Sequence, residues 1–512
     1  MRLFLCDFSS PLAADVAREL RRLGHTIVYW TGCKDHFNQL SSSQEFPDTH
    51  FHSTFDAIQA KPAPNIDANS FEPIGEPLKK IFMDCETIVL PMMNRADFTH
   101  LSLSEKQQLY YQMLGYWHGL LMQMKPDAMI FIDIPHAIYN FVTYSVAKHL
   151  GIKTIMFQIT RLPDRLLITT DFRTGSDRVR EALLHPSLAP VQLEQLSPDI
   201  QEYLQEQFDV TAEPTPFDKR ELDEKAKQKI RFLPPAQKIW KNLCSGKTFQ
   251  TTIAYLKAYR NTKGRMLSIK NDGINYKHKR NLRHPILQKQ EWQKTYTSLT
   301  RPADLSLTYV YVPLHYQPEN STSPAGLMFV DQIQMVRILS AALPPGWRLY
   351  VKEHTSQWNP VDVRAHLGRY DGYYDQIAAI PHVTLVDARV SSFQLIRSSR
   401  AVATVTGTAG WEALLRNKPI LLFGAAWYGL APGLFRVNDV ASAKNAFKHI
   451  VNGYAPDRQA LLTYIAALDR ACIKGYQQQT IFQRVSRIPY PENIRNLVTA
   501  IQETLLDHHE MK

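Results

Sequence analysis

Two stretches of the chain alternate short apolar runs with amphipathic helical segments, and this alternation constrains the fold more than any other feature of the sequence. In the first stretch, an apolar run over residues 3–8 is followed by a helical pattern over residues 11–24 and a second apolar run over residues 26–32. The same pattern resumes over residues 128–160. This spacing is typical of β-α-β units with parallel strands, so we predict a first doubly wound α/β domain.

The second stretch has apolar runs over residues 307–317, 347–354, 401–408 and 419–424, with helical patterns between them. We therefore predict an α/β fold with two facing Rossmann-like domains. Open sheets of this kind bind ligands at the carboxyl ends of their strands, so we expect a ligand cleft between the two sheets.

The region between the two stretches is helical in pattern and strongly basic. Residues 225–289 hold 17 lysines and arginines and one acid, Asp272, in a chain whose formal net charge is +11. We expect this basic tract to dock on an anionic membrane surface or to be a solvated insert. Nucleic acid is not an expected partner, because no recognition motif accompanies the charge. The expected segments are an N-terminal Rossmann-like domain (1–172), a helical basic insert (173–301), a C-terminal Rossmann-like domain (302–450) and C-terminal helices (451–512).

Several common classes of protein are excluded by what the sequence lacks. No window reaches the roughly 18–20 uninterrupted apolar residues of a membrane-spanning helix, and the N-terminus shows no signal-peptide cleavage site, so we expect a cytoplasmic protein. Lys241 stands where a P-loop would have its first glycine, and no GxGxxG follows the first strand. The five cysteines are scattered without a CxxC pair, and no HxH, HExxH or DxD cluster is well placed. We therefore expect free thiols, no essential metal and no cofactor.

The strongest local signal is a small-residue turn between a strand and a helix of the second domain. A backbone turn of small residues lets a ligand approach closely, and the start of a helix attracts an anion such as a sugar-nucleotide phosphate. The acid in the first helical turn would bind ribose hydroxyls. The alternative is an ordinary glycine-rich turn. The residues concerned are Thr406, Gly407, Thr408, Ala409, Gly410 and Glu412.

Two further polar segments follow strands of the same domain. Lys352, Glu353 and His354 come at the end of one strand, and a lysine and a histidine there suit a phosphate or a sugar carboxylate. The loop after the strand that opens this domain offers donors and acceptors to a polar ligand. A solvated strand end and a surface loop are the alternatives. The loop residues are His315, Gln317, Glu319, Ser321 and Thr322.

The first domain has its own polar groups at strand ends. Asp7 and Asp133 each follow an apolar run, and His136 and Arg161 occupy the same kind of position. A positioned carboxylate suits a general base or a nucleophile of glycosyl chemistry. A helix cap is the other reading of an isolated aspartate at a strand end.

The second domain resembles bacterial capsule and surface-polysaccharide biosynthesis proteins of the type that transfers Kdo or nonulosonic acids. VPLHYQPENSTSP, LPPGWRLYVKEH and TGTAGWEALLRNKPILLFG carry the resemblance, in that order, over residues 309–424. IDIPH, AKHLGIKT and a following arginine in the first domain are similar to the same group but match it more weakly. In that family the KEH segment is commonly followed by proline, whereas Thr355 follows it here.

The resemblance implies the two-domain GT-B glycosyltransferase fold and a metal-independent transferase. It implies that the C-terminal domain holds a CMP-sugar donor and that the N-terminal domain faces a glycan or lipid-linked acceptor. His354 and Lys352 would meet the donor phosphate or carboxylate, Gln317 and Glu319 would line the donor pocket, and Asp133 would assist the acceptor hydroxyl. A UDP- or GDP-hexose transferase, an epimerase and a non-catalytic assembly factor are the alternatives.

Overall fold

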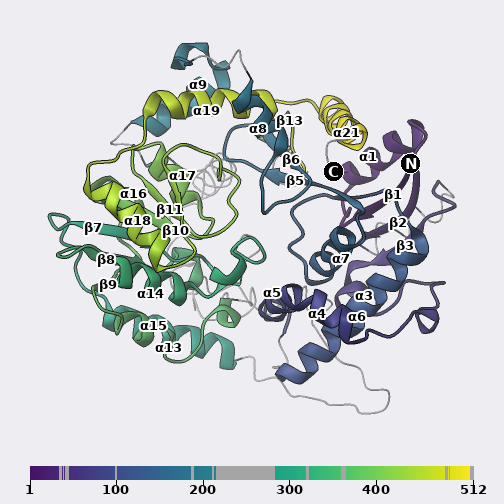
Figure 1. Cartoon of the computed structure of the whole chain (residues 1–512), viewed down its shortest axis with the longest axis horizontal. Helices are drawn as coiled ribbons and strands as arrows, with labels where there is room; N and C mark the ends of the chain where they lie inside the picture. Colours follow the sequence, from purple (N-terminus) through teal and green to yellow (C-terminus); the bar gives the residue numbers. More distant parts are fainter. Residues whose placement is uncertain are drawn as a thin grey trace, which may run out of the picture.

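The computed structural model describes most of both alternating stretches, and Figure 1 shows how their elements are arranged. Residues 225–282 of the basic tract, and Glu319 and Ser321, lie outside the described residues. Apart from isolated positions, the described ranges are 1–33, 45–97, 101–185, 190–209, 283–318, 322–358, 365–478 and 485–507.

The N-terminal domain is built on a seven-stranded sheet in the order β13-β6-β5-β4-β1-β2-β3. The strands β1 to β5 pair with one another in parallel, whereas β6 pairs antiparallel with β5 and with β13. Successive residues of β1 enter opposite cores, Leu3 and Leu5 on one face and Phe4 and Cys6 on the other, because helices cover both faces. The strands are β1 (Arg2–Cys6), β2 (Thr26–Gly32), β3 (His50–Ser53), β4 (Ala128–Phe131), β5 (Lys153–Ile159), β6 (Arg165–Thr169) and β13 (Ile473–Lys474).

Helices pack on the two faces of this sheet. One face carries α1 (Pro11–Arg22) and α21 (Tyr490–Leu506). Ser10 starts α1 by accepting a hydrogen bond from the Ala13 N–H at 3.2 Å, just before a proline suited to the first helical turn. The other face carries α5 (Met83–Met93), α6 (Leu103–Met124) and α7 (Ile138–His149), with α3 (Thr54–Ile58) and α4 (Glu76–Ile81) beside them.

The C-terminal domain is built on a six-stranded, fully parallel sheet in the order β12-β11-β10-β7-β8-β9. One face is covered by α13 (Arg283–Leu299), α14 (Gln332–Ala342), α15 (Tyr373–Ala378) and α18 (Val440–Val451), and the other by α16 (Ser392–Ser398), α17 (Thr408–Leu414) and α19 (Arg458–Ala471). The expected pair of Rossmann-like domains is therefore confirmed. The strands are β7 (Tyr309–Pro313), β8 (Arg348–Lys352), β9 (Val383–Val386), β10 (Ala401–Thr404), β11 (Ile420–Leu422) and β12 (Leu434–Arg436).

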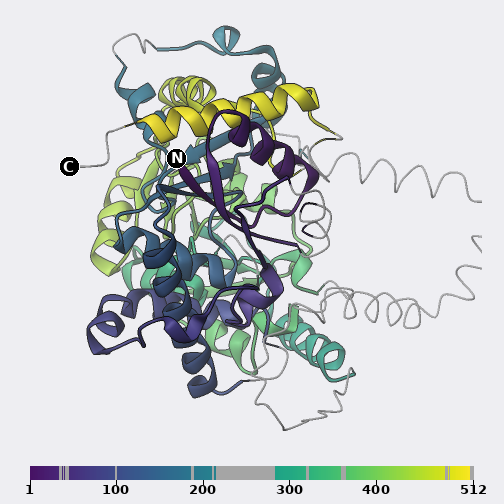
Figure 2. The ribbon, with the colours of Figure 1, turned by 90° about the vertical axis from the view of Figure 1, so that its right-hand side faces the viewer.

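The chain passes between the domains more than once. After β6, α8 (Asp177–Leu184) and α9 (Pro198–Phe208) pack with α19 of the second domain. The end of the chain then returns, because β13 pairs with β6 and α21 lies beside α1 (Figure 2). The buried Arg165 of β6 joins these parts, binding Asp469 of α19 at 2.6 Å and Asp199 of α9 at 2.7 Å. The expected segment boundaries stay a prediction.

Among the described residues, no helix combines the length and the apolar character needed to cross a membrane.

Candidate functional site

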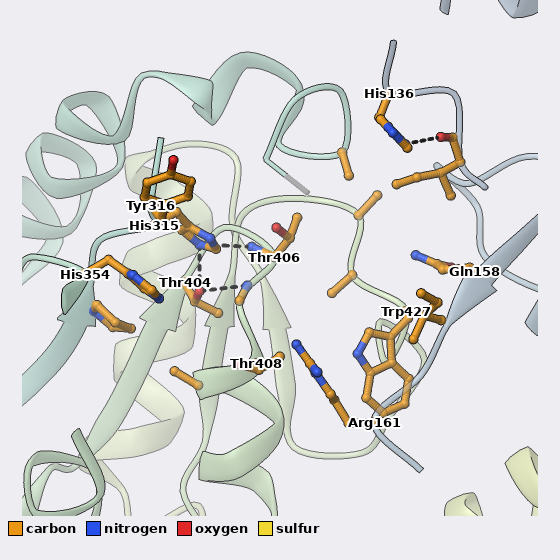
Figure 3. A pocket seen from close by; sticks show the side chains of 18 of the residues that line it. His136, Gln158, Arg161, His315, Tyr316, His354, Thr404, Thr406, Thr408 and Trp427 are labelled. Carbon is orange, nitrogen blue, oxygen red and sulfur yellow. Dashed lines mark hydrogen bonds between the residues drawn. The ribbon is translucent and has the colours of Figure 1, made fainter. Parts of the chain in front are cut away.

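A cavity of about 580 Å³ lies between the two domains, at the carboxyl ends of strands from both sheets. We call its two sides the first-domain wall (Asp133, His136, Gln158, Arg161) and the second-domain wall (His315, His354, Thr404, Thr406). Figure 3 labels all of these residues except Asp133. Nine of the residues predicted from the sequence line this cavity. They are Asp133, His136, Arg161, His315, His354, Thr406, Gly407, Thr408 and Ala409.

The His315 ring is held in the second-domain wall because one of its nitrogens, Nε2, accepts hydrogen bonds from its neighbours. The Gly407 N–H donates to Thr404 Oγ1 at 3.1 Å, and this hydroxyl oxygen lies 3.1 Å from His315 Nε2. The N–H groups of Val405 and Thr406 also point at Nε2, at 3.3 and 3.4 Å. Because Nε2 only accepts, the neutral ring carries its proton on Nδ1. The second-domain wall therefore fixes the tautomer of this histidine (Figure 3).

His354 follows β8 and has the opposite tautomer. The Ser356 N–H donates to His354 Nδ1 at 3.1 Å, so the proton of the neutral imidazole lies on Nε2. Thr406 adds a buried hydroxyl oxygen, Oγ1, with no hydrogen-bond partner among the described residues. A buried hydroxyl without a partner is costly, so this arrangement suits a polar ligand in the cavity.

Packing beneath the small-residue turn explains why it is built from glycines. A Cβ at Gly407 would lie 2.9 Å from Thr404 Oγ1 and 3.0 Å from His315 Cε1. At Gly410 it would lie 2.2 Å from the Tyr428 hydroxyl oxygen. Gly407, Thr408 and Ala409 thus line the cavity, whereas Gly410 lies buried behind them.

Glu353 does not reach the cavity, although the sequence analysis placed it in the donor pocket. Side chains alternate in extended backbone, so Glu353 contacts Tyr374 in the core on one face of the sheet, whereas Lys352 contacts Val390 on the other face. Its carboxylate accepts both Arg369 Nε and Nη2, at 2.8 and 2.9 Å, and the Tyr374 hydroxyl at 2.6 Å. The Glu353 and Arg369 side chains are 0% exposed. Each neutralises the charge of the other, which would be costly if it were buried without a partner.

Arg369 connects this ion pair to the loop that carries His315. Its Nη1 donates to Gln317 Oε1 at 2.9 Å and its Nη2 donates to the His315 carbonyl at 3.0 Å. Gln317 therefore lies behind the second-domain wall and supports it, and it does not line the cavity.

Lys352 and Glu412 also lie away from the cavity. Lys352 Nζ donates to the Val390 carbonyl at 2.8 Å, and burial lowers the pKa of this lysine to about 8, although Glu412 and two other acids act against the shift. Glu412 lies on α17, close enough to Arg416 to act on its pKa as well. The structure therefore does not bring these two predicted donor residues to the cavity.

The first-domain wall holds a carboxyl with an unusual ionisation. Asp133 Oδ1 accepts the Ile134 N–H at 2.8 Å. Burial, with a smaller contribution from the nearby Asp7 carboxylate, raises the pKa of Asp133 to about 7. Asp7 itself is not among the cavity-lining residues. Arg161 extends into the space between Thr408 and Trp427 (Figure 3), and it is the one arginine or lysine among the described lining residues.

Some lining residues were not predicted from the sequence. Thr404 and Gln158 are strand-end residues, so the rule that selected their neighbours would have found them. Trp427 follows β11 and packs on Trp411 with ring centroids 4.8 Å apart, and only its place after a strand marks it. Gln478 comes from the C-terminal segment, for which the sequence pattern gave no signal.

Among the described residues, no three His, Cys, Asp or Glu side chains come together as a group that could hold a metal ion. The predicted absence of a metal and a cofactor stays a prediction.

Comparison with known proteins gives one match to a family and several remote likenesses. Residues 333–475 match the family described as capsule polysaccharide biosynthesis protein. Protein FixF of Sinorhizobium fredii is 24% identical over 169 residues, which are 33% of this chain and 38% of the length of FixF.

Solved structures match this chain only remotely. The Thermosulfurimonas dismutans protein KpsC, a β-Kdo 2,7 transferase, is 10% identical with a TM-score of 0.27, over 84% of this chain and 97% of that one. The UDP-GlcNAc 2-epimerase of Neisseria meningitidis is 13% identical with a TM-score of 0.23, over 99% and 100%. Likenesses of this size carry no conclusion about activity. The family match supports the resemblance predicted from the strand-end segments: over residues 333–475, this chain is similar to capsule polysaccharide biosynthesis proteins.

Proposed function

We propose that this chain is a GT-B-type glycosyltransferase of surface polysaccharide biosynthesis, acting on capsule or lipopolysaccharide. It transfers a Kdo-like or nonulosonic acid from a CMP-sugar to a glycan acceptor, without a metal or cofactor. The observation that carries this proposal is the composition of the cavity. One carboxyl of raised pKa, Asp133, lines the same interdomain space as hydrogen-bond donors and a buried hydroxyl of the second domain. The family match over residues 333–475 supports the process in which it acts.

The donor belongs on the second-domain wall. A CMP leaving group develops negative charge on its phosphate, and hydrogen-bond donors stabilise this charge best when they are already oriented before the reaction. His354 offers its Nε2 proton there, and Arg161 supplies a fixed positive charge from across the cavity. Lys352 was expected in this role, but its position outside the cavity leaves the role to these two residues.

The acceptor belongs on the first-domain wall. An acceptor hydroxyl attacks the anomeric carbon and gives its proton to the Asp133 carboxylate. A new carbon–oxygen bond forms while the bond from the sugar to the phosphate oxygen breaks, and CMP leaves with that electron pair. A base with a pKa near 7 is well matched to proton transfer at neutral pH.

Nucleotide binding tests this proposal and separates it from its rivals. We expect CMP to raise the melting temperature more than UDP or GDP at equal concentration. Stabilisation by UDP or GDP alone would favour a hexose transferase or an epimerase. Incubation with a CMP-Kdo or CMP-sialic acid donor and a glycan acceptor should then release CMP. Nucleotide binding without any release or sugar transfer would favour an assembly factor.

The basic tract over residues 225–289 supports a second, separate proposal. Its 17 basic residues would attract the protein to the anionic inner face of the cytoplasmic membrane, at about 1 kcal/mol for each well-placed residue. Flotation with vesicles that contain phosphatidylglycerol should carry the full chain upward at low salt and release it at high salt. Equal failure to float at both salt concentrations would exclude this role.

A further inference from the structure

The interdomain cavity extends from His354 to a tryptophan at its other end. Trp427 follows β11 and lines the cavity, and two strands, β10 and β7, separate β11 from β8, which precedes His354. Figure 3 shows Trp427 on the side of the cavity where Gln158 of the first-domain wall lies. Gln478, from the segment after β13, lines the same cavity. We call Trp427, Gln158 and Gln478 the tryptophan end.

Trp427 is held in a fixed orientation by two aromatic neighbours. Its ring centroid lies 4.8 Å from that of Trp411 and 5.3 Å from that of Tyr428. Trp411 is itself anchored, because its Nε1 donates to the Tyr203 hydroxyl at 2.8 Å. The Tyr428 hydroxyl donates to the Gly407 carbonyl at 2.5 Å. The indole therefore offers the cavity a rigid apolar surface, and a ligand that packs on it need not order a loose side chain.

The Gln158 side chain lies on the face of the first sheet that meets Trp427. Gln158 pairs with Leu167 across β5 and β6, and residues directly opposite each other in an antiparallel pair have their side chains on one face. Leu167 belongs to the buried cluster against which Trp427 packs. The pairing of β13 with β6 brings Gln478 to the same cavity. The tryptophan end thus combines an aromatic surface of the second domain with two amides from the side of the first sheet.

A pyranose ring needs both of these kinds of contact. Its faces carry C–H groups that pack on an aromatic ring, and its rim carries hydroxyls that donate and accept hydrogen bonds. A glutamine amide has two donor hydrogens and an acceptor oxygen, so it can bind a hydroxyl in either direction. No hydrogen bond joins the amide of Gln158 or of Gln478 to another described residue, which leaves both amides able to bind a ligand.

We propose that the tryptophan end is a subsite for a sugar ring of the glycan acceptor, which stacks on Trp427 while the amides of Gln158 and Gln478 bind its hydroxyls. That this sugar belongs to the acceptor rests on the proposed function, whereas the binding of a sugar does not. A nucleobase could also stack on a tryptophan. The acceptor is favoured because both amides come from the side of the first sheet, which also carries Asp133, the base proposed for the acceptor hydroxyl.

Fluorine NMR of the full chain labelled with 5-fluorotryptophan tests sugar binding without any assay of activity. The chain has eight tryptophans, and the Trp427 signal is assigned by its loss in Trp427→Phe. The probes are CMP and the methyl glycosides of glucose, galactose, Kdo and sialic acid, at millimolar concentration. At least one glycoside should shift the Trp427 signal, and CMP should shift it less. The signal of Trp347, which packs on Phe447 of α18, is the control and should stay in place.

Kinetics with an acceptor that supports transfer give a second measurement. Trp427→Leu removes the aromatic surface and should raise KM for the acceptor by roughly tenfold or more, and Trp427→Phe should restore most of this loss. Gln478→Ala alters an exposed side chain, so it should leave the fold intact and raise the same KM by roughly threefold to tenfold. KM for the CMP-sugar should stay within about twofold in all three variants.

The outcomes separate this inference from the proposed function. A Trp427 signal that no glycoside shifts, or that CMP shifts most, would overturn the inference even if sugar transfer is observed. An unaltered KM for the acceptor in Trp427→Leu would overturn it as well. A signal that glycosides shift, in a protein that transfers no sugar from CMP-, UDP- or GDP-sugars, would overturn the proposed function and keep the sugar subsite.

Discussion

The two walls of the cavity differ in the kind of polar group that each presents. In the second-domain wall, His315 receives several donors at Nε2, and a fully buried ion pair between Glu353 and Arg369 supports its loop from behind. In the first-domain wall, burial raises the pKa of Asp133 to about 7. One wall presents oriented hydrogen-bonding groups, and the other presents a carboxyl that can gain or lose a proton near neutral pH.

This difference fits a division of labour. A wall that must stabilise developing charge gains most from groups that are already oriented, because reorganisation costs energy at the moment of reaction. A wall that must move a proton needs a group whose two protonation states are close in free energy. The walls can therefore be distinguished by variants that alter rate, stability or affinity.

The largest effect should come from the first-domain wall. Asp133→Asn keeps the shape of the side chain and removes the base, so we expect the rate of transfer to fall by roughly 10²–10⁴-fold. The measurement is CMP release under saturating donor. Affinity for CMP should stay within about twofold of the unaltered protein, because we propose that the nucleotide binds to the other wall. A rate within tenfold of the unaltered one would remove Asp133 from the role of base.

The support behind the second-domain wall should give the next effect. Arg369→Met leaves the Glu353 carboxylate buried and unpaired, so the free energy of unfolding should fall by about 3–5 kcal/mol. Urea denaturation measures this change. Arg389→Ala is the matched control, because the Arg389 side chain is 89% exposed in its pair with Asp387. Similar losses in both variants would mean that the buried pair is not a special support.

Lys352 gives a pH-dependent effect on the same side of the molecule. Its pKa is lowered to about 8 in the folded protein, while an unfolded lysine titrates near 10.4, so the unfolded state binds more protons between these values. The free energy of unfolding should therefore gain a contribution of the order of 3 kcal/mol as pH rises from about 8 to about 10.5.

Comparison of Lys352→Met with the unaltered protein isolates this contribution from the tyrosines that titrate in the same range. Denaturant unfolding at several pH values should show that the difference in the free energy of unfolding between the two proteins narrows or changes sign from about pH 8 to about pH 10.5. If the free energies of unfolding of the two proteins changed with pH in parallel, the pKa of Lys352 would not be lowered by folding.

The smallest effect should come from Thr404. Thr404→Val removes the hydroxyl that joins the Gly407 N–H to His315 Nε2 and leaves the volume nearly unchanged. We expect CMP affinity to fall about tenfold, equivalent to about 1.4 kcal/mol, measured by calorimetry. Thr308, just before β7, offers a control as Thr308→Val, which should bind CMP like the unaltered protein. Unaltered binding in Thr404→Val would separate the His315 arrangement from nucleotide recognition.

The sequence was sufficient to predict the two sheets and the edge at which their ligand site lies. Parallel strands buried on both faces read as continuous apolar runs, so residues just after them, such as His315, His354 and Asp133, could be placed at the cavity. Sequence position alone did not give the direction of a side chain. Lys352 ends β8 and Glu353 follows it directly, yet neither side chain reaches the cavity.

Long-range pairing accounts for what was missed. Arg369 lies in a loop without a strand-end position, yet it supports both Glu353 and Gln317. Gln478 lines the cavity because the end of the chain returns to the first sheet through β13. No local pattern marks a residue that reaches the cavity from so far along the chain.

A crystal structure of the protein soaked with CMP tests the central claim most directly. We predict nucleotide density in the interdomain cavity, with the phosphate within hydrogen-bond distance of His354 Nε2 and on the opposite side of the cavity from Asp133. Clear density for CMP at any other place on the molecule, or a phosphate held against Asp133, would contradict the account.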